Sequence, residues 1–216
     1  MQVLRDDAYK LFKRRLLAGD LRPGQFVTQK ELADMIGVSM NPAREAIQRL
    51  QFERLLEVYP KRGIQIAVAD PKTVNDAYDF RILLETQAIR RFAERAPVER
   101  IHKIVETTES LIRTFASSPD NEDVLLDTAE GDWNFHEEII DFLDNQFISE
   151  HFRLNSARIR LCQRNNGQSR QRLGPALEEH LELLAACERR QVAAATKLIN
   201  RHIETSRAFA LGTRSA

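Results

Sequence analysis

Four side chains in the second half of the chain have types and spacings that suit a metal ion. Asp132 and His136 lie four residues apart in Asp-Trp-Asn-Phe-His, so a helix would place a carboxylate and an imidazole on one face. His180 and His202 each fall on the apolar stripe of a predicted helix, which directs both imidazoles inward. Three imidazoles and one carboxylate suit a borderline divalent ion, with Zn2+ as the first candidate and Ni2+ or Mn2+ as alternatives.

Spacing alone leaves other interpretations of these residues open. A single histidine on an apolar stripe is commonly a hydrogen-bonded core residue, and a bound ion can merely fix the geometry of helices. Three histidines and one aspartate with an open coordination position can also activate water, which would make the protein a metal-dependent hydrolase. No separate residue stands out as a general base for that reaction. A third alternative, a scaffold protein, leaves inward histidines in an apolar bundle unexplained.

The helices that carry these residues belong to the larger of two predicted domains. Asp70-Pro71 is predicted to be the N-cap and first residue of a helix. Beyond this pair the strand patterns vanish, and helical periodicity predicts an antiparallel all-helical bundle over residues 70–216. The predicted helices span roughly 72–95, 98–117, 122–143, 146–164, 175–189 and 191–209. The pair Gly174-Pro175 is interpreted as the break before the fifth of them.

Residues 1–69 have the parts of a winged helix-turn-helix. Helices are predicted over residues 3–18, 28–36 and 39–53, the second of them from the capping-box pattern Thr28-Gln-Lys-Glu. Two short runs, 55–59 and 64–68, predict a hairpin with a basic tip. The predicted fold class is therefore mainly α, with a winged helix-turn-helix followed by a helical bundle.

The third predicted helix presents a polar face that suits base recognition. The N-terminal part of a recognition helix reaches base edges, and Arg44 can pair bidentately with guanine. The candidates for DNA contact on this helix, the helix before it and the hairpin tip are Lys30, Ser39, Met40, Asn41, Arg44, Gln48, Arg49, Lys61, Arg62 and Gly63. Charged residues are common on solvated faces, so the assignment depends on the whole arrangement.

The net charge of zero hides an asymmetry between the two predicted domains. Residues 1–69 carry 12 Lys and Arg against 8 Asp and Glu, whereas residues 70–216 carry 20 against 24. A basic N-terminal domain followed by an acidic domain is typical of a DNA-binding module joined to another domain. No apolar stretch approaches the ~18 residues of a membrane helix, and the N-terminus lacks a secretory signal pattern. We therefore expect a cytoplasmic protein without a membrane partner.

The N-terminal residues also carry a family resemblance. The segments Leu21-Arg-Pro-Gly-Gln, Glu31-Leu-Ala-Asp-Met-Ile-Gly-Val-Ser and Pro42-Ala-Arg-Glu-Ala-Ile-Gln-Arg-Leu resemble the DNA-binding domain of the GntR family of bacterial regulators, and the wing Pro60-Lys-Arg-Gly-Ile matches as well. The resemblance implies DNA contacts from Lys30, Ser39, Arg44 and the wing tip at Gly63. The residue after Ser39 is often arginine in the family and is Met40 here, which implies a different operator preference.

The second domain resembles the FCD effector domain of the FadR-like branch of GntR regulators. The segment Tyr78-Asp-Phe-Arg-Ile-Leu-Leu-Glu is similar to the opening helix of that domain. Metal-binding FCD domains use an Asp-x3-His pair and two later histidines, and all four positions are filled here. The resemblance therefore favours a metal site over hydrogen-bonded core histidines.

The same resemblance implies a dimeric, ligand-responsive regulator, by family default a repressor, that binds a near-palindromic double-stranded DNA operator. A small organic acid is the expected effector, because a four-ligand site leaves exchangeable positions on a five- or six-coordinate ion. Arg81, in the first bundle helix, is suited to clamp a carboxylate bidentately. Asn155 and Arg158 are further candidates for effector binding.

Overall fold

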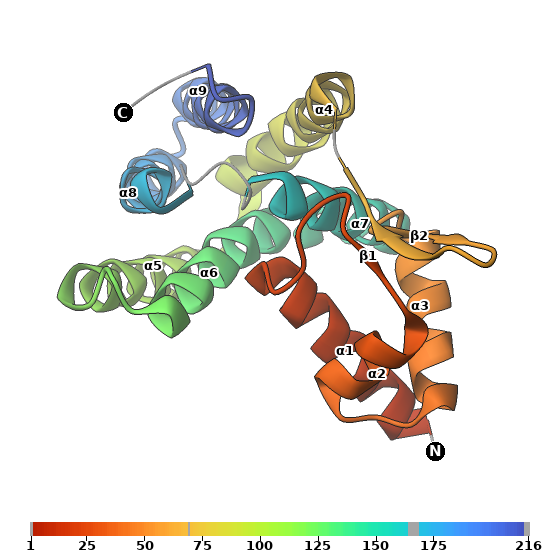
Figure 1. Cartoon of the computed structure of the whole chain (residues 1–216). Coiled ribbons are helices and arrows are strands. Elements are labelled where there is room, and N and C mark those ends of the chain that lie inside the picture. Colours follow the sequence, from red (N-terminus) through yellow and green to blue (C-terminus); the bar gives the residue numbers. More distant parts are fainter. Residues whose placement is uncertain (1, 69, 164–168, 214–216) are drawn as a thin grey trace.

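The computed structural model describes residues 2–68, 70–163 and 169–213, without the side chains of residues 2–6, 17, 18, 162, 163, 169 and 170. The first part of the chain, here called the head, contains α1 (Gln2–Ala18), β1 (Phe26–Val27), α2 (Gln29–Ile36), α3 (Met40–Phe52), β2 (Leu56–Tyr59) and β3 (Gly63–Ile66). The second part, the bundle, contains α4 (Pro71–Arg95), α5 (Val98–Ser117), α6 (Glu122–Asp141), α7 (Gln146–Gln163), α8 (Ser169–Glu188) and α9 (Val192–Ala210). The head lies below the bundle in Figure 1.

Local signals in the sequence begin and end the helices of the head. The Thr28 hydroxyl accepts a hydrogen bond from the Glu31 backbone N–H, and the Glu31 carboxylate accepts one from the Thr28 N–H, so the predicted capping box is confirmed. Gly37 ends α2 in the left-handed conformation at φ 68°. The buried residues of α3 are Ala43, Ala46, Ile47 and Leu50, which lie along one face of the helix.

The wing is a three-stranded antiparallel sheet in the order β1-β3-β2. The predicted hairpin forms β2 and β3, with Tyr59 opposite Gly63. The two-residue strand β1 was not predicted, and it pairs Val27 with Ile64 of β3. Gly63 has φ 106°, and a Cβ there would lie 2.9 Å from the Val27 carbonyl oxygen, so both the backbone conformation and the close strand require glycine.

The bundle starts at a helix cap that the sequence predicts. The Asp70 carboxylate accepts a hydrogen bond from the Thr73 backbone N–H, and Pro71 occupies the first turn of α4. α4 packs along α9, and α8 packs against both α9 and α5. Within the described ranges, no helix combines the length and apolar character needed to cross a membrane.

One predicted helix boundary is wrong. α8 begins at Ser169 and runs through Pro175, whereas the sequence predicts a start at residue 175. Proline lacks a backbone N–H and crowds the preceding turn, so it normally marks the first turn of a helix. Here it lies inside the helix. The added residues place Arg172 on α8, where its side chain is buried.

The head and the bundle are joined by packing as well as by sequence. α7 contacts α4, α6 and α9 on its bundle side and α1 on its head side (Figure 1). Ala157 and Leu161 of α7 belong to the hydrophobic cluster of the head. The Arg158 Nε donates to the Glu53 carbonyl oxygen at 3.0 Å. The core of the head is therefore completed by a bundle helix.

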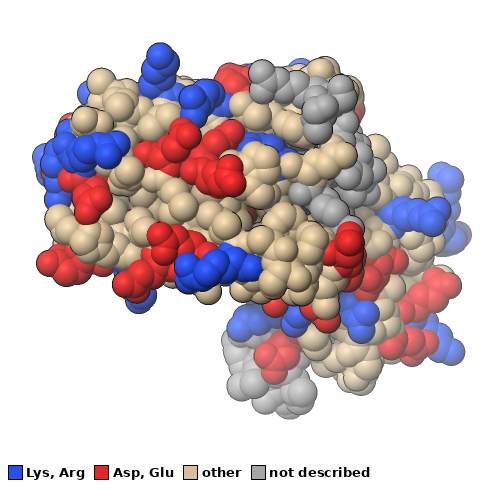
Figure 2. Space-filling model, turned by 90° about the vertical axis from the view of Figure 1, so that its left-hand side faces the viewer, with Lys and Arg blue, Asp and Glu red and all other residues tan. Residues whose placement is uncertain are grey.

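Charged side chains are mixed over the surface of the bundle. On the face in Figure 2, acidic and basic groups are interspersed over the larger, upper lobe. The excess of acidic residues in this part of the chain is thus not gathered into one patch on that face. The more unusual charges are inside, because Arg81, Glu85 and Arg172 are all buried.

Candidate functional site

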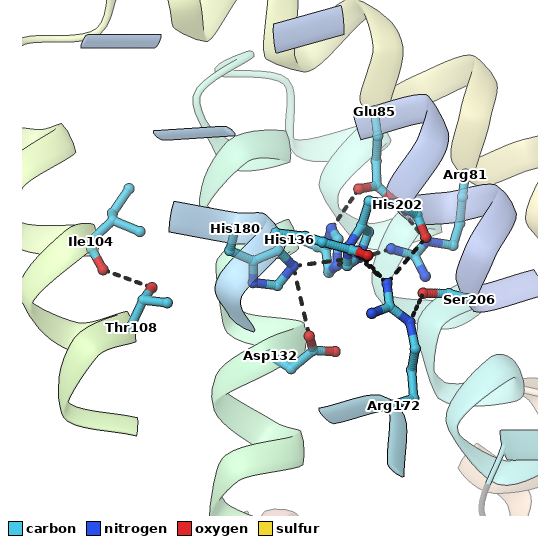
Figure 3. Close-up of polar contacts among 11 residues, drawn as sticks. Arg81, Glu85, Ile104, Thr108, Asp132, His136, Arg172, His180, His202 and Ser206 are labelled. Atoms are coloured by element: carbon cyan, nitrogen blue, oxygen red, sulfur yellow. Dashed lines mark hydrogen bonds and ion pairs between the residues drawn. The ribbon is translucent and has the colours of Figure 1, made fainter. Parts of the chain in front are cut away.

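Asp132, His136, His180 and His202 come together inside the bundle (Figure 3). α6 supplies Asp132 and His136, α8 supplies His180, and α9 supplies His202. One ligand atom from each residue lies within 4.8 Å of the other three. Nε2 of His202 is 3.2 Å from Nε2 of His136 and 3.4 Å from Nε2 of His180, while Asp132 Oδ1 is 3.7 Å from His180 Nε2. The structure therefore brings the four predicted ligands to one point from three helices.

Two outer carboxylates fix the orientation of two of these imidazoles. Glu85 Oε2 lies 2.6 Å from His136 Nδ1, and Glu179 Oε2 lies 2.7 Å from His202 Nδ1. An ionised carboxylate accepts a hydrogen bond, so Nδ1 carries the proton and the Nε2 lone pair of each ring faces the cluster. Metal-binding histidines generally have such a partner on the other nitrogen. The buried His180 Nδ1 has no hydrogen-bond partner among the described residues.

The donor set fits a divalent ion. Lone pairs of imidazole nitrogens that face one another at 3.2 and 3.4 Å repel unless a cation or a proton lies between them. Zn–N bonds of about 2.0–2.1 Å place two nitrogens at the corners of a tetrahedron about 3.3 Å apart, which matches these separations. Asp132 Oδ1 is buried without a hydrogen-bond partner in the described part of the chain, so a carboxyl oxygen is available as the fourth ligand.

Burial and neighbouring charges keep two of the histidines and the outer Glu85 in the ionisation states that a metal site needs, whereas burial raises the pKa of the Asp132 carboxyl. Burial first, and then the nearby imidazoles and arginines, hold the pKa values of His180 and His202 well below the usual value, so both rings are neutral. Burial alone would raise the pKa of Glu85. Arg81 and His136 outweigh it and lower that pKa to about 2, so Glu85 is ionised in the interior.

Arg81, predicted as an effector clamp, lies directly beside the cluster. Its Nε donates to Glu85 Oε1 at 2.6 Å, and its Nη2 lies 3.1 Å from His136 Nε2. A metal ion at His136 Nε2 would use the lone pair that now faces this guanidinium. The Nη2 hydrogen would then be free for another acceptor next to the ion.

Arg172 is a second buried arginine at the cluster, on the opposite side of His202 from His136 (Figure 3). Its Nη2 donates to Glu179 Oε2 at 2.5 Å, and its Nε lies 3.3 Å from Ser206 Oγ. Its Nη1 is buried and has no hydrogen-bond partner among the residues that the structure describes. The guanidinium is thus held by two of its nitrogens, while the third is uncommitted.

Three residues at the site were not predicted from the sequence, namely Glu85, Glu179 and Arg172. A signal for Glu85 exists, since it lies four residues after Arg81 and shares its helix face. Arg172 lies before the predicted start of its helix, and that misplaced start hid its inward position. Glu179 contacts Arg172 seven residues earlier on α8 and His202 on α9. The misplaced start of α8 hid the first pairing, and the second joins residues too far apart in the sequence for a local pattern.

The structure gives the two other effector-binding candidates different partners. The Asn155 side-chain amide donates to the Ala77 carbonyl oxygen at 2.9 Å, which ties α7 to α4. Arg158 donates to the Glu53 carbonyl oxygen in the head. Neither contact involves the four clustered ligands, so both side chains join helices together here.

The predicted DNA-contacting residues are mostly on the surface of the head. Lys30, Arg44 and Gln48 are exposed, and Lys61 and Arg62 extend at the tip of the wing. The other exposed candidates are Ser39, Met40 and Asn41, and Gly63 is half-buried.

Arg49 differs from the other candidates because it turns back onto the head. Its guanidinium lies 3.7 Å from the centre of the Tyr9 ring, and its Nε is 3.9 Å from Glu53 Oε1. The positive charge of Arg49 is therefore in contact with the Tyr9 ring and the Glu53 carboxylate of the head itself. The structure therefore favours a packing role for Arg49 over its predicted DNA contact.

Comparisons with known families agree with both halves of the chain. The family described as bacterial regulatory proteins of the gntR family matches residues 4–66, and the FCD domain family matches residues 76–205. The second match alone spans more than half of the 216 residues.

Individual relatives and a solved structure point the same way. An uncharacterised HTH-type transcriptional regulator, YdhC of Bacillus subtilis, is 27% identical over 197 residues, which is 90% of this chain and 85% of that protein. The gluconate operon transcriptional repressor of B. subtilis is 29% identical over 168 residues, covering 71% of this chain and 65% of the repressor. The structure of E. coli McbR/YncC has a TM-score of 0.82 over 97% of this chain and 98% of that one, at 19% identity, and so shares the fold. The chain belongs to the GntR family of bacterial transcription regulators, with an FCD domain as its helical bundle.

Proposed function

We propose that this regulator is a metal-dependent repressor that binds a near-palindromic operator as a homodimer and responds to a small carboxylate. The observation that carries the proposal is the buried cluster of three imidazoles and one carboxylate, with outer carboxylates on two of the rings. We assign DNA binding to residues 1–69 and effector binding and dimerisation to residues 70–216. Repression is supported by the relative named as the gluconate operon repressor, and a repressor of bacterial DNA acts in the cytoplasm.

The hydrolase alternative has no support from the comparisons. Both matching families consist of transcription regulators and not of enzymes. The ion, with Zn2+ as the first candidate and Ni2+ or Mn2+ as alternatives, is assigned to effector binding instead. Asp132, His136, His180 and His202 would hold it, and a carboxylate would occupy its remaining positions beside Arg81.

The helices that surround the cluster offer a route from the effector to the DNA. α4 carries Arg81 and Glu85, and it begins at Pro71, directly after the head. α7 packs on α1 from the bundle side. Small movements of these helices would change the separation of the two recognition helices in a dimer, and an operator with fixed half-site spacing responds to that change.

An operator titration tests the proposal. The full chain selects its operator from a random pool of double-stranded DNA, and affinity is then measured with and without a panel of small organic acids. We expect an effective acid to weaken binding of the metal-loaded protein by about 5- to 150-fold, because allosteric coupling is typically about 1–3 kcal/mol. The metal-stripped protein is expected to show no response to the same acid.

Metal content is the control for that titration. The wild-type chain is expected to contain about one divalent ion per chain by elemental analysis, and His180→Ala and His202→Ala to lose it. The exposed His102, paired with Glu188 on the surface, supplies the matched variant His102→Ala, which should keep the ion. Full metal content in His180→Ala and His202→Ala would exclude the assigned ligands, and an acid response without metal would exclude the metal-bound effector.

The recognition helix gives a second prediction. Arg44→Ala is expected to cost about 1–3 kcal/mol on the selected operator and to relax specificity, because a bidentate contact to guanine is lost. Arg62→Ala at the wing tip is expected to weaken the operator and random DNA to the same extent. Competition binding on both DNAs measures the two effects. Equal losses on both DNAs for Arg44→Ala would show that Arg44 does not contact a base.

A further inference from the structure

We propose that Arg172 binds the effector, with its Nη1 donating to a carboxylate oxygen beside the metal, and that the site prefers a monocarboxylate to a dicarboxylate. The inference deepens the proposed function and depends on it, since it concerns the effector of the same metal site. Two observations support it. The buried guanidinium of Arg172 has one nitrogen without a hydrogen-bond partner among the described residues, and the charges around the cluster do not cancel.

The orientation of Arg172 is determined by its other nitrogens. Nη2 is bonded to Glu179, and Nε lies against Ser206, so the plane of the guanidinium has little freedom to turn. In Figure 3 the remaining terminal nitrogen of Arg172 points toward the side of the cluster on which Asp132 lies. Because Nη1 is buried as well, its hydrogens face the interior of the bundle and not solvent.

A buried, charged N–H group without an acceptor is unfavourable. Among the described residues, Asp132 Oδ1 and Arg172 Nη1 both lack a hydrogen-bond partner. An ion can satisfy the Asp132 oxygen, but a cation cannot satisfy a guanidinium. A ligand carboxylate can satisfy Arg172, because one of its oxygens can bind the ion while the other accepts a charge-assisted hydrogen bond.

The charges around the cluster specify how many carboxylates fit. The positive groups at the cluster are the divalent ion, Arg81 and Arg172, and the negative groups are Asp132, Glu85 and Glu179. Arg160 also acts on Asp132, but its main partners are Glu130 and Glu137, which balance its charge. With neutral histidines the sum is one positive charge. One carboxylate neutralises it, whereas a second would leave an uncompensated negative charge inside the protein, which is costly.

Calorimetric titration of the full-length protein loaded with Zn2+ tests both parts of the inference. The probes are chain-matched pairs, propionate with malonate and butyrate with succinate. We expect each monocarboxylate to bind about tenfold or more tightly than its partner. Arg172→Lys keeps the positive charge but replaces the guanidinium, with its several N–H donors, by a single ammonium nitrogen. It is therefore expected to weaken monocarboxylate binding about tenfold or more, which corresponds to the loss of one charged hydrogen bond.

Two further variants control for structural effects. Arg207→Lys changes a partly buried guanidinium of the same bundle that pairs with the exposed Asp79, outside the cluster, and it should bind the probes as the wild type does. Arg172→Gln, which keeps hydrogen-bonding groups and loses the charge, is expected to weaken binding at least as much as Arg172→Lys. Metal content and thermal unfolding of each variant show that the site and the fold persist.

The outcomes separate this inference from the proposed function. Wild-type monocarboxylate affinity in metal-loaded Arg172→Lys and Arg172→Gln would overturn the role of Arg172. Tighter binding of malonate or succinate would overturn the charge argument, and so would an absence of binding for every probe. Operator binding and metal content are measured on the same samples. If both persist while the Arg172 dependence fails, this inference alone is wrong, whereas loss of the metal from the wild type would contradict the proposed function itself.

Discussion

Replacing Glu85 by alanine is expected to lower the free energy of unfolding by about 3–5 kcal/mol, because it leaves a buried charge without its partner. Glu85 and Arg81 form an ion pair whose side chains are 0% and 2% exposed, and Glu85 also accepts from His136 Nδ1. The variant keeps the Arg81 guanidinium in the interior without a carboxylate. The contribution of Glu85 is present above pH of about 4.5 and is lost as the pH falls toward its folded pKa of about 2.

Urea unfolding of the metal-stripped protein measures this loss without a contribution from the ion. The same helix supplies a matched control, because Lys72 and Asp76 of α4 form an ion pair with the same four-residue spacing, but their side chains are 82% and 61% exposed. Asp76→Ala is expected to change stability very little. Similar effects of Asp76→Ala and Glu85→Ala would show that the buried pair contributes no more than a surface pair.

Operator affinity is expected to fall by about 10³- to 10⁵-fold between 50 and 200 mM salt, the decrease typical of about 6–10 phosphate contacts. Apart from Arg44, which is assigned to a base, and Arg49, which contacts Tyr9 and Glu53, each head exposes three cations on the helix before the recognition helix and on the wing, namely Lys30, Lys61 and Arg62. A dimer presents twice as many of these cations, which is within the range of phosphate contacts given above. Binding each phosphate releases condensed counterions, and added salt reduces that gain.

Fluorescence anisotropy over a salt series gives the slope of log affinity against log salt. Lys61→Gln is expected to make the slope shallower by about 2 for a dimer, since one phosphate contact is lost from each chain. Lys103 is an exposed lysine on α5 in the bundle, so Lys103→Gln should leave the slope unchanged. A slope near zero for the wild type would contradict the assignment of DNA contacts to the head.

Most of the secondary structure could be predicted because local chemistry determines it. The Thr28 capping box, the Asp70 cap and the apolar periods of the helices are visible in the sequence and are found in the structure. β1 could not be predicted, since a two-residue strand has no periodicity and exists only through its pairing with β3. The start of α8 was wrong because tertiary packing overrides the usual preference of Pro175 for a helix start.

The site was predictable to the extent that its residues show a pattern within one helix. Asp132 and His136 share a helix face, and His180 and His202 lie on apolar stripes, so their inward positions follow from spacing. The hydrogen bonds of Glu179 and Arg172 to α9 join residues 23 and 34 positions apart, so no local pattern indicates them. The bond between Arg172 and Glu179 lies within α8, but Arg172 precedes the predicted start of that helix. The hydrogen bond of Arg158 could not be predicted for the same reason, because its acceptor lies 105 residues away in the head.

The place of α7 in the hydrophobic cluster of the head limits how freely this head can be recombined with other effector domains. Ala157 and Leu161 cover apolar side chains of the head, and they come from α7, which begins only at Gln146 and follows three complete bundle helices. A fragment that ends at the linker would present that apolar surface to water. A chimaera that joins the head to a different body would need a helix with matching small and apolar residues at the same two places. Exchange of operator specificity between such regulators is therefore expected to succeed by substitutions on the outer face of α3 more readily than by transplanting the head.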